Sequence, residues 1–352
     1  MTWNGGVREG GVRMRTTRLR SRLRGWGGVG AMAVLCALAL AFVLLLPKLE
    51  RHRPVVPVLG GGGPAAEAAQ ARAGTCTDAT AQDLSLPPSD ATGPAVEAVR
   101  ARGYLSVGVD QNSYRWGYRS PDDASGALEG FDIDLAHRIA RDLLGDAGKV
   151  QFRAIPTNER ITAIRSGRVD MVVRTMTITC DRLEQVAFSA PYFRTGQQVL
   201  APKTSPVTGY DASLAGRKVC SAAGSTAHDH LSADKKTGRL PASTDISITV
   251  PSQLDCLVRL RLGEADAVVT DGALAASQAA QDPAVEPKGA PFTEEYYGVA
   301  MRRGADDLVR RVNRILDDYR KDGGWKASYD RWLLPTLGKD TPSATPPVPV
   351  YR

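Results

Sequence analysis

Two short segments of the chain share one pattern, and this repeat limits the folds open to the sequence. Residues 167–173 and 263–269 both read G-x-x-D-x-V-V, at an offset of 96 residues. Each segment follows apolar residues at helical spacing, so its glycine is expected to end a helix and its valine-rich run to form a buried parallel strand. Two similar helix-to-strand units predict two similar α/β lobes.

Other segments agree with an α/β fold with mostly parallel sheets. Residues 105–109 alternate as a strand does, and the apolar residues of 133–143 lie on one face of a helix that Gly145 ends. We expect lobe 1 to comprise residues 76–199 plus 293–339 and lobe 2 to comprise residues 200–292. Two chain crossings, near residues 195–199 and 293–297, then form a two-strand hinge.

The N-terminal region has the features of a membrane anchor. Residues 29–46 carry no charge and follow six arginines between positions 13 and 24. This arrangement predicts a basic cytoplasmic tail (1–28) and a transmembrane helix (29–46). Residues 47–51 offer no signal-peptidase site, which favours an uncleaved signal anchor with the folded part on the extracellular side of the cell membrane.

The basic charge of the chain is confined to that region. The chain carries +7 overall, but residues 1–53 hold ten Lys or Arg against two Glu, so the remainder sums to about −1. A nucleic-acid partner is therefore not expected. Glycine and alanine in 47–75 predict a flexible linker, and the Pro-rich tail, 340–352, is expected to be equally flexible.

Five cysteines are present, and Cys36 lies in the apolar run. No CxxC pair occurs among the other four, Cys76, Cys180, Cys220 and Cys256. In an exported chain they predict two disulfides, and their spacing leaves three connectivities open.

Polar residues follow both repeated segments, where ligands of open α/β sheets bind. Thr175, Thr177 and Arg182 follow the first, and Asp271 follows the second. A guanidinium binds a carboxylate through two parallel hydrogen bonds, and a carboxylate accepts from an ammonium group, so this set suits an amino-acid zwitterion. Considered alone, Arg182 fits a surface arginine equally well, and Asp271 fits a loop aspartate.

A third candidate element comprises residues 220–226, where a strand runs into small residues and then a helix. Backbone N–H groups at such a helix start bind anions, and Gly224 permits close approach. Ser225 and Thr226 are alternatively N-caps of this helix.

At this point the sequence resembles a known family. Residues 130–140, GFDIDLAHRIA, match the signature of family 3 extracellular solute-binding proteins, the polar amino acid receptors of ABC importers. The order of the other motifs agrees: TITxxR at 177–182, FSxPY at 188–192, GST at 224–226 and DAVVTD at 266–271. The resemblance covers roughly residues 93–335 and implies a periplasmic-binding-protein-like fold.

The resemblance also implies roles for individual residues. Arg182 would hold the ligand α-carboxylate, helped by Thr177 and Thr226, and Asp271 would hold the α-ammonium. Thr175 would be a further ligand contact. Tyr114 would be the aromatic residue that flanks the ligand side chain.

The sequence is similar to actinobacterial glutamate- and glutamine-type receptors, with Val-Gly-Val-Asp-Gln at 107–111. That similarity implies a Cys220–Cys256 disulfide and leaves Cys76–Cys180 as the other. Arg174, beside the expected pocket, favours glutamate, aspartate or their amides as the ligand. Strand alternation would alternatively turn Arg174 away from the cleft.

The chain is interpreted as a receptor with ABC permease subunits as partners, without a cofactor or metal, and not as an enzyme. Two alternatives stay open: a membrane-anchored sensor or scaffold, and a dehydratase built on the same fold. His228 and His230 resemble half a metal site without a third ligand.

Overall fold

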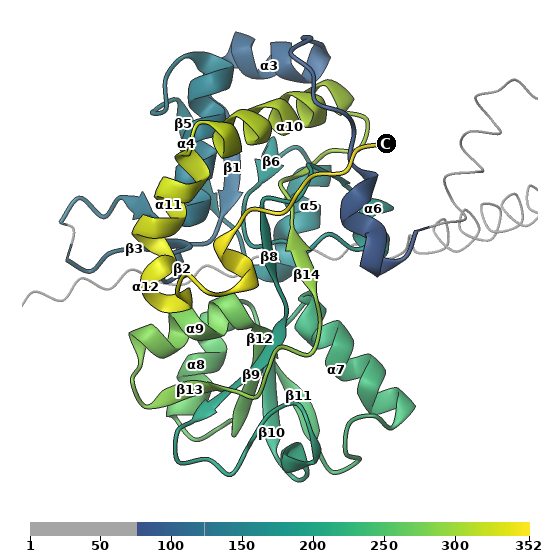
Figure 1. Ribbon diagram of the computed structural model, residues 1–352, viewed down its shortest axis with the longest axis vertical. Helices are drawn as coiled ribbons and strands as arrows, with labels where there is room; N and C mark the ends of the chain where they lie inside the picture. The colour runs from purple at the N-terminus through teal and green to yellow at the C-terminus, as the bar shows by residue number, and fades with distance from the viewer. Residues whose placement is uncertain (1–75, 123) are drawn as a thin grey trace, which may run out of the picture. The chain divides into compact units, whose positions relative to one another are not determined.

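The computed structural model describes residues 76–122 and 124–352. They form two lobes, each built on a five-stranded sheet, and two extended crossings join the lobes (Figure 1). The expected cytoplasmic tail, signal anchor and linker all lie outside the described residues. In the part of the chain that the structure covers, no helix is both long and apolar enough to cross a bilayer.

Lobe 1 is built on a sheet of order β5-β1-β6-β15-β7, in which β5, β1 and β6 run parallel and β15 pairs antiparallel with both β6 and β7. These strands are β1 (Leu105–Val109), β5 (Val150–Ala154), β6 (Met171–Val172), β7 (Ala187–Phe188) and β15 (Ala300–Met301). A separate small sheet contains β2 (Asn112–Ser113), β3 (Gly117–Arg119) and β4 (Leu128–Glu129). The helices of lobe 1 are α3 (Pro94–Arg102), α4 (Phe131–Leu144), α5 (Arg160–Arg165), α6 (Cys180–Leu183), α10 (Asp306–Lys321), α11 (Gly324–Trp332) and α12 (Leu334–Leu337), with 3-10 turns η1 (Asp78–Leu84), η2 (Thr157–Glu159) and η4 (Pro342–Ala344).

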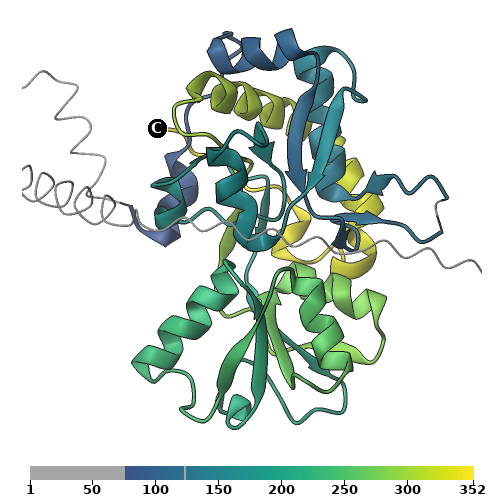
Figure 2. The same cartoon turned by 180° about the vertical axis from the view of Figure 1, so that it is seen from behind.

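Lobe 2 repeats this arrangement with the order β11-β10-β12-β9-β13, in which β9 alone runs antiparallel to the other four strands (Figure 2). Its strands are β9 (Gln197–Pro202), β10 (Lys218–Ala222), β11 (Asp245–Val250), β12 (Ala267–Asp271) and β13 (Val285–Lys288). Its helices are α7 (Thr226–Thr237), α8 (Gln253–Arg261) and α9 (Gly272–Gln281), with a 3-10 turn η3 (Ala212–Leu214).

The repeated pattern has the same structure in both lobes, as predicted. Gly167 and Gly263 adopt φ values of 74° and 71° after α5 and α8, a conformation that glycine adopts without strain. The motif carboxylates, Asp170 and Asp266, each accept the backbone N–H of a residue in the neighbouring parallel strand at 2.8 Å. The pattern therefore encodes a helix end, a strand and a bond to the next strand.

The hinge consists of β8 (Phe193–Thr195) and β14 (Glu295–Tyr297), which pair antiparallel. Gln197 already pairs with Asp271 in the sheet of lobe 2, so that lobe begins earlier than the expected boundary at residue 200. The crossing strands are shorter than the expected crossings, and only one residue separates the end of β8 from the start of β9.

The expectation of a flexible C-terminal tail is wrong. Ala344 is buried in the core of lobe 1, and the Ser343 hydroxyl donates to the Arg194 carbonyl at 2.7 Å. The Tyr351 hydroxyl donates to Asp317 at 2.8 Å. Proline disfavours helices and central strands, but an extended proline-rich segment can still pack along a folded surface.

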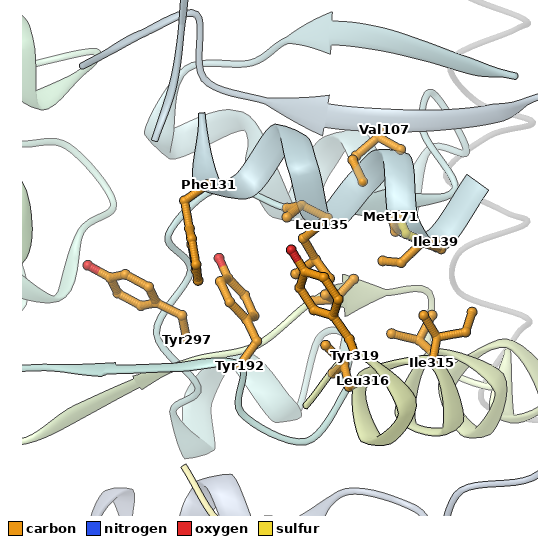
Figure 3. Packing of buried hydrophobic residues seen from close by; sticks show 14 of the residues in the cluster. Val107, Phe131, Leu135, Ile139, Met171, Tyr192, Tyr297, Ile315, Leu316 and Tyr319 are labelled. Carbon is orange, nitrogen blue, oxygen red and sulfur yellow. The ribbon is translucent and has the colours of Figure 1, made fainter. Parts of the chain in front are cut away.

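The core of lobe 1 continues to the hinge (Figure 3). Leu135 and Ile139 of α4 face Ile315 of α10, and the aromatic residues Tyr192 and Tyr297 lie at the end of this cluster. The Tyr297 ring belongs to hinge strand β14 and is fully buried. The hinge strand is thereby fixed to lobe 1 by packing, which sets the direction of its other side chains.

Two disulfides join Cys76 to Cys180 and Cys220 to Cys256. The first connects the start of the described chain to α6, and the second connects β10 to α8 within lobe 2. This is the pairing that the family resemblance implies.

Candidate functional site

The two lobes meet around a small cavity of about 20 Å³. Residues of both lobes line it: Thr157, Arg160, Arg174, Thr175, Thr177, Arg182, Ala222, Ser225, Thr226, Ala227, Gln253, Val269, Thr270, Asp271 and Leu274. Seven of the eight ligand-binding residues predicted from the sequence are in this set, and Tyr114 is the exception. The cavity has room for little more than a water molecule.

Arg182 lies near the end of α6 in lobe 1, and its side chain is buried. Its guanidinium donates to the Thr177 carbonyl at 2.7 Å and to the Gly224 carbonyl of lobe 2 at 3.2 Å. Burial lowers the pKa of Arg182, while Glu295 acts in the opposite direction. The structure therefore places a desolvated cation at the wall of the cavity.

Asp271 closes the opposite side, at the carboxyl end of β12 in lobe 2. It accepts hydrogen bonds from the Tyr297 hydroxyl and from the Gln197 side-chain amide. Burial and the neighbouring Glu295 carboxylate raise the pKa of Asp271 to about 7. An ammonium group would stabilise the ionised form of this carboxylate through its positive charge and its hydrogen bonds.

Thr175 is held in a left-handed backbone conformation, with φ 41°, which is rare for a β-branched residue. Its backbone N–H donates to Asp132 at 3.0 Å, and the Tyr192 hydroxyl donates to the same carboxyl at 2.9 Å. Asp132 is fully buried, and burial raises its pKa to about 7. The signature residue Asp132 thus fixes the loop that carries Thr175 and Thr177.

Ser225 and Thr226 have different positions at the start of α7. The Ser225 hydroxyl accepts the His228 backbone N–H at 3.2 Å and donates to the Ala222 carbonyl at 2.6 Å, so Ser225 is the N-cap of the helix. The Thr226 hydroxyl instead donates to Glu295 at 2.9 Å. Both residues line the cavity.

Gly224 joins the lobes directly before this helix. Its carbonyl accepts from Arg182 and from Arg160, each at 3.2 Å. Its φ is 72°, and a Cβ there would lie 3.0 Å from the backbone of Asn158 in lobe 1. A glycine is therefore required for the lobes to approach this closely.

Arg174 lines the cavity but is already paired. Its guanidinium lies 2.8 Å from the Asp110 carboxylate and donates to the Thr157 hydroxyl at 2.9 Å. It also donates to the Ser252 hydroxyl of lobe 2 at 3.2 Å. The alternation that would have turned Arg174 away does not apply, because β6 ends at Val172.

Tyr114 lines a second cavity, of about 10 Å³. Gln253 and Leu274 line both cavities, so the two are neighbours. The Tyr114 ring packs edge-on against Tyr118, with the ring centroids 5.0 Å apart. The structure therefore places Tyr114 beside the cavity that the other seven residues line.

The histidines do not form a metal site in the part of the chain that the structure describes. His228 Nδ1 lies 3.4 Å from the Ser221 hydroxyl, and His230 Nε2 lies 3.7 Å from the Glu295 carboxylate. Among these described residues, no group of three or more His, Cys, Asp or Glu is arranged to hold a metal ion.

This combination of two similar lobes, a two-strand hinge and charged residues of both lobes at one cavity agrees with a comparison of the sequence with known families. The model of bacterial extracellular solute-binding proteins, family 3, matches residues 105–335. The chain belongs to this family.

Relatives of this family 3 protein include binding proteins for glutamine and for glutamate. It is 32% identical over 236 residues to the ABC transporter glutamine-binding protein GlnH of Bacillus subtilis (strain 168), which covers 67% of this chain and 83% of GlnH. It is 28% identical over 260 residues to the glutamate-binding protein GluB of Corynebacterium efficiens, covering 71% of this chain and 84% of GluB.

A solved structure extends the comparison to the fold. The ancestral amino acid-binding protein AncCDT-1, a precursor of cyclohexadienyl dehydratase, matches with a TM-score of 0.60 at 32% identity. The match covers 68% of this chain and the whole of that one. The periplasmic-binding-protein-like architecture of the family 3 protein is thereby shown.

Five residues around the cavity were missed by the sequence analysis: Asp110, Arg160, Gln197, Gln253 and Glu295. Arg160 is buried at the start of α5 and donates to the Thr157 carbonyl at 2.9 Å. Burial, and then the nearby Arg182 and Arg174 cations, push its pKa well below the usual value. Asp110 belongs to the segment at 107–111 but was given no role there, and the other four belong to no motif. Alternation along the hinge segment would have turned either Glu294 or Glu295 inward.

Proposed function

We propose that this family 3 protein binds one polar L-amino acid between its lobes and delivers it to an ABC importer. The observation that carries the proposal is the pair of buried, oppositely charged residues Arg182 and Asp271, which come from different lobes and line one cavity. Arg182 would bind the α-carboxylate and Asp271 the α-ammonium, so only the closed arrangement binds both ends of the zwitterion.

Binding requires the lobes to separate and close again. Several hydrogen bonds between the lobes surround the cavity, among them Thr157 N–H to the Pro251 carbonyl at 2.9 Å and Trp116 Nε1 to the Ser277 hydroxyl at 3.2 Å. A cavity of about 20 Å³ cannot admit an amino acid while these bonds persist. Rotation about β8 and β14 would open it, as in hinge closure around ligands generally.

The balance of charges favours a ligand with an uncharged side chain. Three guanidinium groups and three carboxyl groups meet around the cavity: Arg160, Arg174, Arg182, Asp110, Asp271 and Glu295. Asp110 neutralises Arg174, and the three carboxyl groups balance the three guanidinium groups in number, so a side-chain carboxylate would add a negative charge without a matching cation. Within the predicted class of glutamate, aspartate and their amides, we therefore favour glutamine.

Isothermal titration of the purified protein with the twenty common amino acids tests this proposal. We expect saturable one-to-one binding, tightest for glutamine, with glutamate and aspartate weaker. Preference for lysine, arginine or histidine would reject the proposed ligand class. Absence of binding by every amino acid would reject the receptor function itself.

We further propose that residues 29–46 anchor the receptor in the cell membrane, with the lobes outside. The uncharged run with arginines before it supports an anchor, and the two disulfides favour an oxidising compartment. Recovery in the membrane fraction after alkaline washing, together with cleavage of the lobes by protease added to intact cells, is the expected outcome. A protein released by washing would contradict the anchor.

The receptor is proposed not to be an enzyme. Arg174 is paired with Asp110, and Arg182 and Asp271 are bonded to neutral neighbours, an arrangement suited to binding the two ends of a zwitterion. The likeness to a precursor of cyclohexadienyl dehydratase makes prephenate-type compounds the substrates to test. Release of carbon dioxide or water from them by the purified protein would overturn this part of the proposal.

A further inference from the structure

The inner face of the hinge strand β14 carries two polar side chains toward the cavity. Glu295 and Tyr297 are buried, whereas Glu294, next to them, is exposed and pairs with Arg194. Tyr297 donates its hydroxyl hydrogen to Asp271. The hinge therefore contributes directly to the surroundings of the carboxyl group that is expected to bind an ammonium.

One carboxylate oxygen of Glu295 connects the two lobes. It accepts the Thr177 hydroxyl of lobe 1 at 2.7 Å and the Thr226 hydroxyl of lobe 2 at 2.9 Å. The other oxygen accepts the Gln197 side-chain amide at 3.1 Å. The same Gln197 nitrogen also faces Asp271 and, at 3.0 Å, the Thr226 oxygen, so its two hydrogens are shared among three acceptors.

Counting hydroxyl hydrogens shows what these bonds leave for a ligand. A threonine hydroxyl has one hydrogen to donate and two lone pairs to accept with. Thr177 and Thr226 both use their hydrogen on Glu295, so neither can donate it to a ligand carboxylate. Each instead keeps a lone pair, which is suited to an ammonium hydrogen.

We propose that Glu295 is a positioning residue of the ammonium site: it turns the oxygen lone pairs of Thr177 and Thr226 toward the ligand and holds Gln197 against Asp271. This inference rests on the proposed amino-acid binding. It leaves the α-carboxylate to the Arg182 guanidinium rather than to the threonine hydroxyls. It also explains why a second carboxylate lies beside Asp271 instead of a neutral residue.

Other charged or titratable groups lie around the two carboxyl groups. They are Arg160 of α5, Arg182 of α6, Asp229 and His230 of α7, and Tyr297 of β14. Since these groups stay the same when residue 295 alone is changed, a difference between variants reports on Glu295. His230 has an exposed imidazole 3.7 Å from Glu295 and needs its own control.

The test compares Glu295→Gln with Glu294→Gln, the same change at the exposed residue directly before β14. Each full-length protein is titrated with L-glutamine and with glutaramate, which is glutamine without its α-ammonium group. At pH 8 we expect Glu295→Gln to bind glutamine about tenfold more weakly, because a nearby anion and the orientation of two acceptors are lost. Its affinity for glutaramate should stay within twofold of wild type.

The pH profile provides a second readout. Removing the Glu295 charge should shift the low-pH loss of glutamine binding downward by about one pH unit, because a like charge no longer raises the pKa of Asp271. Glu294→Gln should leave the profile unchanged. The comparison of wild type with Glu295→Gln is repeated in proteins that also carry His230→Gln, so that the exposed imidazole does not titrate.

If Glu295→Gln loses affinity for glutamine and for glutaramate equally and keeps the wild-type pH profile, Glu295 only maintains the fold. That result would overturn the inference. If circular dichroism shows that Glu295→Gln does not fold, Thr177→Val, which removes one oriented hydroxyl, should show the same selectivity for the ammonium. Wild-type protein that binds glutaramate but not glutamine would also overturn it. Wild-type protein that binds no amino acid would instead reject the proposed function, and this inference with it.

Discussion

Replacing Arg182 by alanine should remove most of the ligand affinity. The side chain is only 7% exposed, and its two hydrogen bonds go to carbonyl groups of both lobes, at 2.7 and 3.2 Å. These bonds leave further N–H groups of the guanidinium for a ligand carboxylate. In the closed arrangement burial desolvates this cation, so a ligand carboxylate would be its charged partner there.

The size of the effect follows from the burial. Truncating one partner of a buried, hydrogen-bonded charge pair costs about 2–5 kcal/mol of binding free energy. At about 1.4 kcal/mol per tenfold change, the dissociation constant should rise by roughly 30-fold to several thousandfold. The loss of two buried bonds to carbonyls will also destabilise the closed arrangement.

Isothermal titration with glutamine measures this change, and Arg168→Ala is the matched control. The Arg168 side chain is 47% exposed and pairs with the exposed Glu159, so its loss should alter affinity less than twofold. A folded Arg182→Ala protein whose dissociation constant stays within threefold of wild type would refute the reasoning.

Four further predictions concern pH and stability. The pKa of Asp271 is raised to about 7, and its ionised form is expected to bind the ligand ammonium. Glutamine affinity should therefore fall about tenfold per pH unit below 7. A dissociation constant that stays the same from pH 8 to 5.5 would be inconsistent with this. Asp132→Ala leaves the Thr175 N–H and the Tyr192 hydroxyl without their acceptor. This variant should have a free energy of unfolding in urea about 1–3 kcal/mol lower than wild type. Asp132→Asn keeps an acceptor and should lose less. The folded-state pKa of Asp132, about 7, lies above its ordinary value of 3.8, so this carboxyl favours the folded state increasingly as pH falls from 7 toward 4, and denaturation of Asp132→Asn should lack that contribution. Serine at both Cys220 and Cys256 should lower the free energy of unfolding by about 4 kcal/mol, from chain entropy over a sequence separation of 36, and equal urea midpoints for variant and wild type would contradict it.

Local sequence patterns predicted the two α/β lobes, and the family resemblance supplied the periplasmic-binding-protein-like architecture. The glycine that ends a helix and the valine-rich strand after it are short-range features, so two copies of them predicted two lobes. The role of the motif aspartates was not predictable in the same way, because Asp170 and Asp266 bind strands that lie far away in the sequence.

The candidate site was only partly predictable, for the same reason. Arg182 and Asp271 follow predicted strands, and topology brings the ends of such strands together. Glu295 and Asp110 act through partners more than 60 residues away, and no spacing rule connects them. Arg174 shows the consequence: its sequence position suggested a free cation, but its charge is balanced by Asp110.

The tail illustrates a limit of composition. Proline content predicts the absence of helix and sheet, and 340–352 contains one short 3-10 turn. It does not predict the absence of packing, since Tyr351 and Ala344 find partners in lobe 1.

A crystal structure of the protein grown with L-glutamine would test the central claim most directly. The account predicts one ligand between the lobes, with its α-carboxylate on the Arg182 guanidinium and its α-ammonium on Asp271. A ligand bound elsewhere, or one that contacts a single lobe and leaves either residue without a ligand atom, would contradict it.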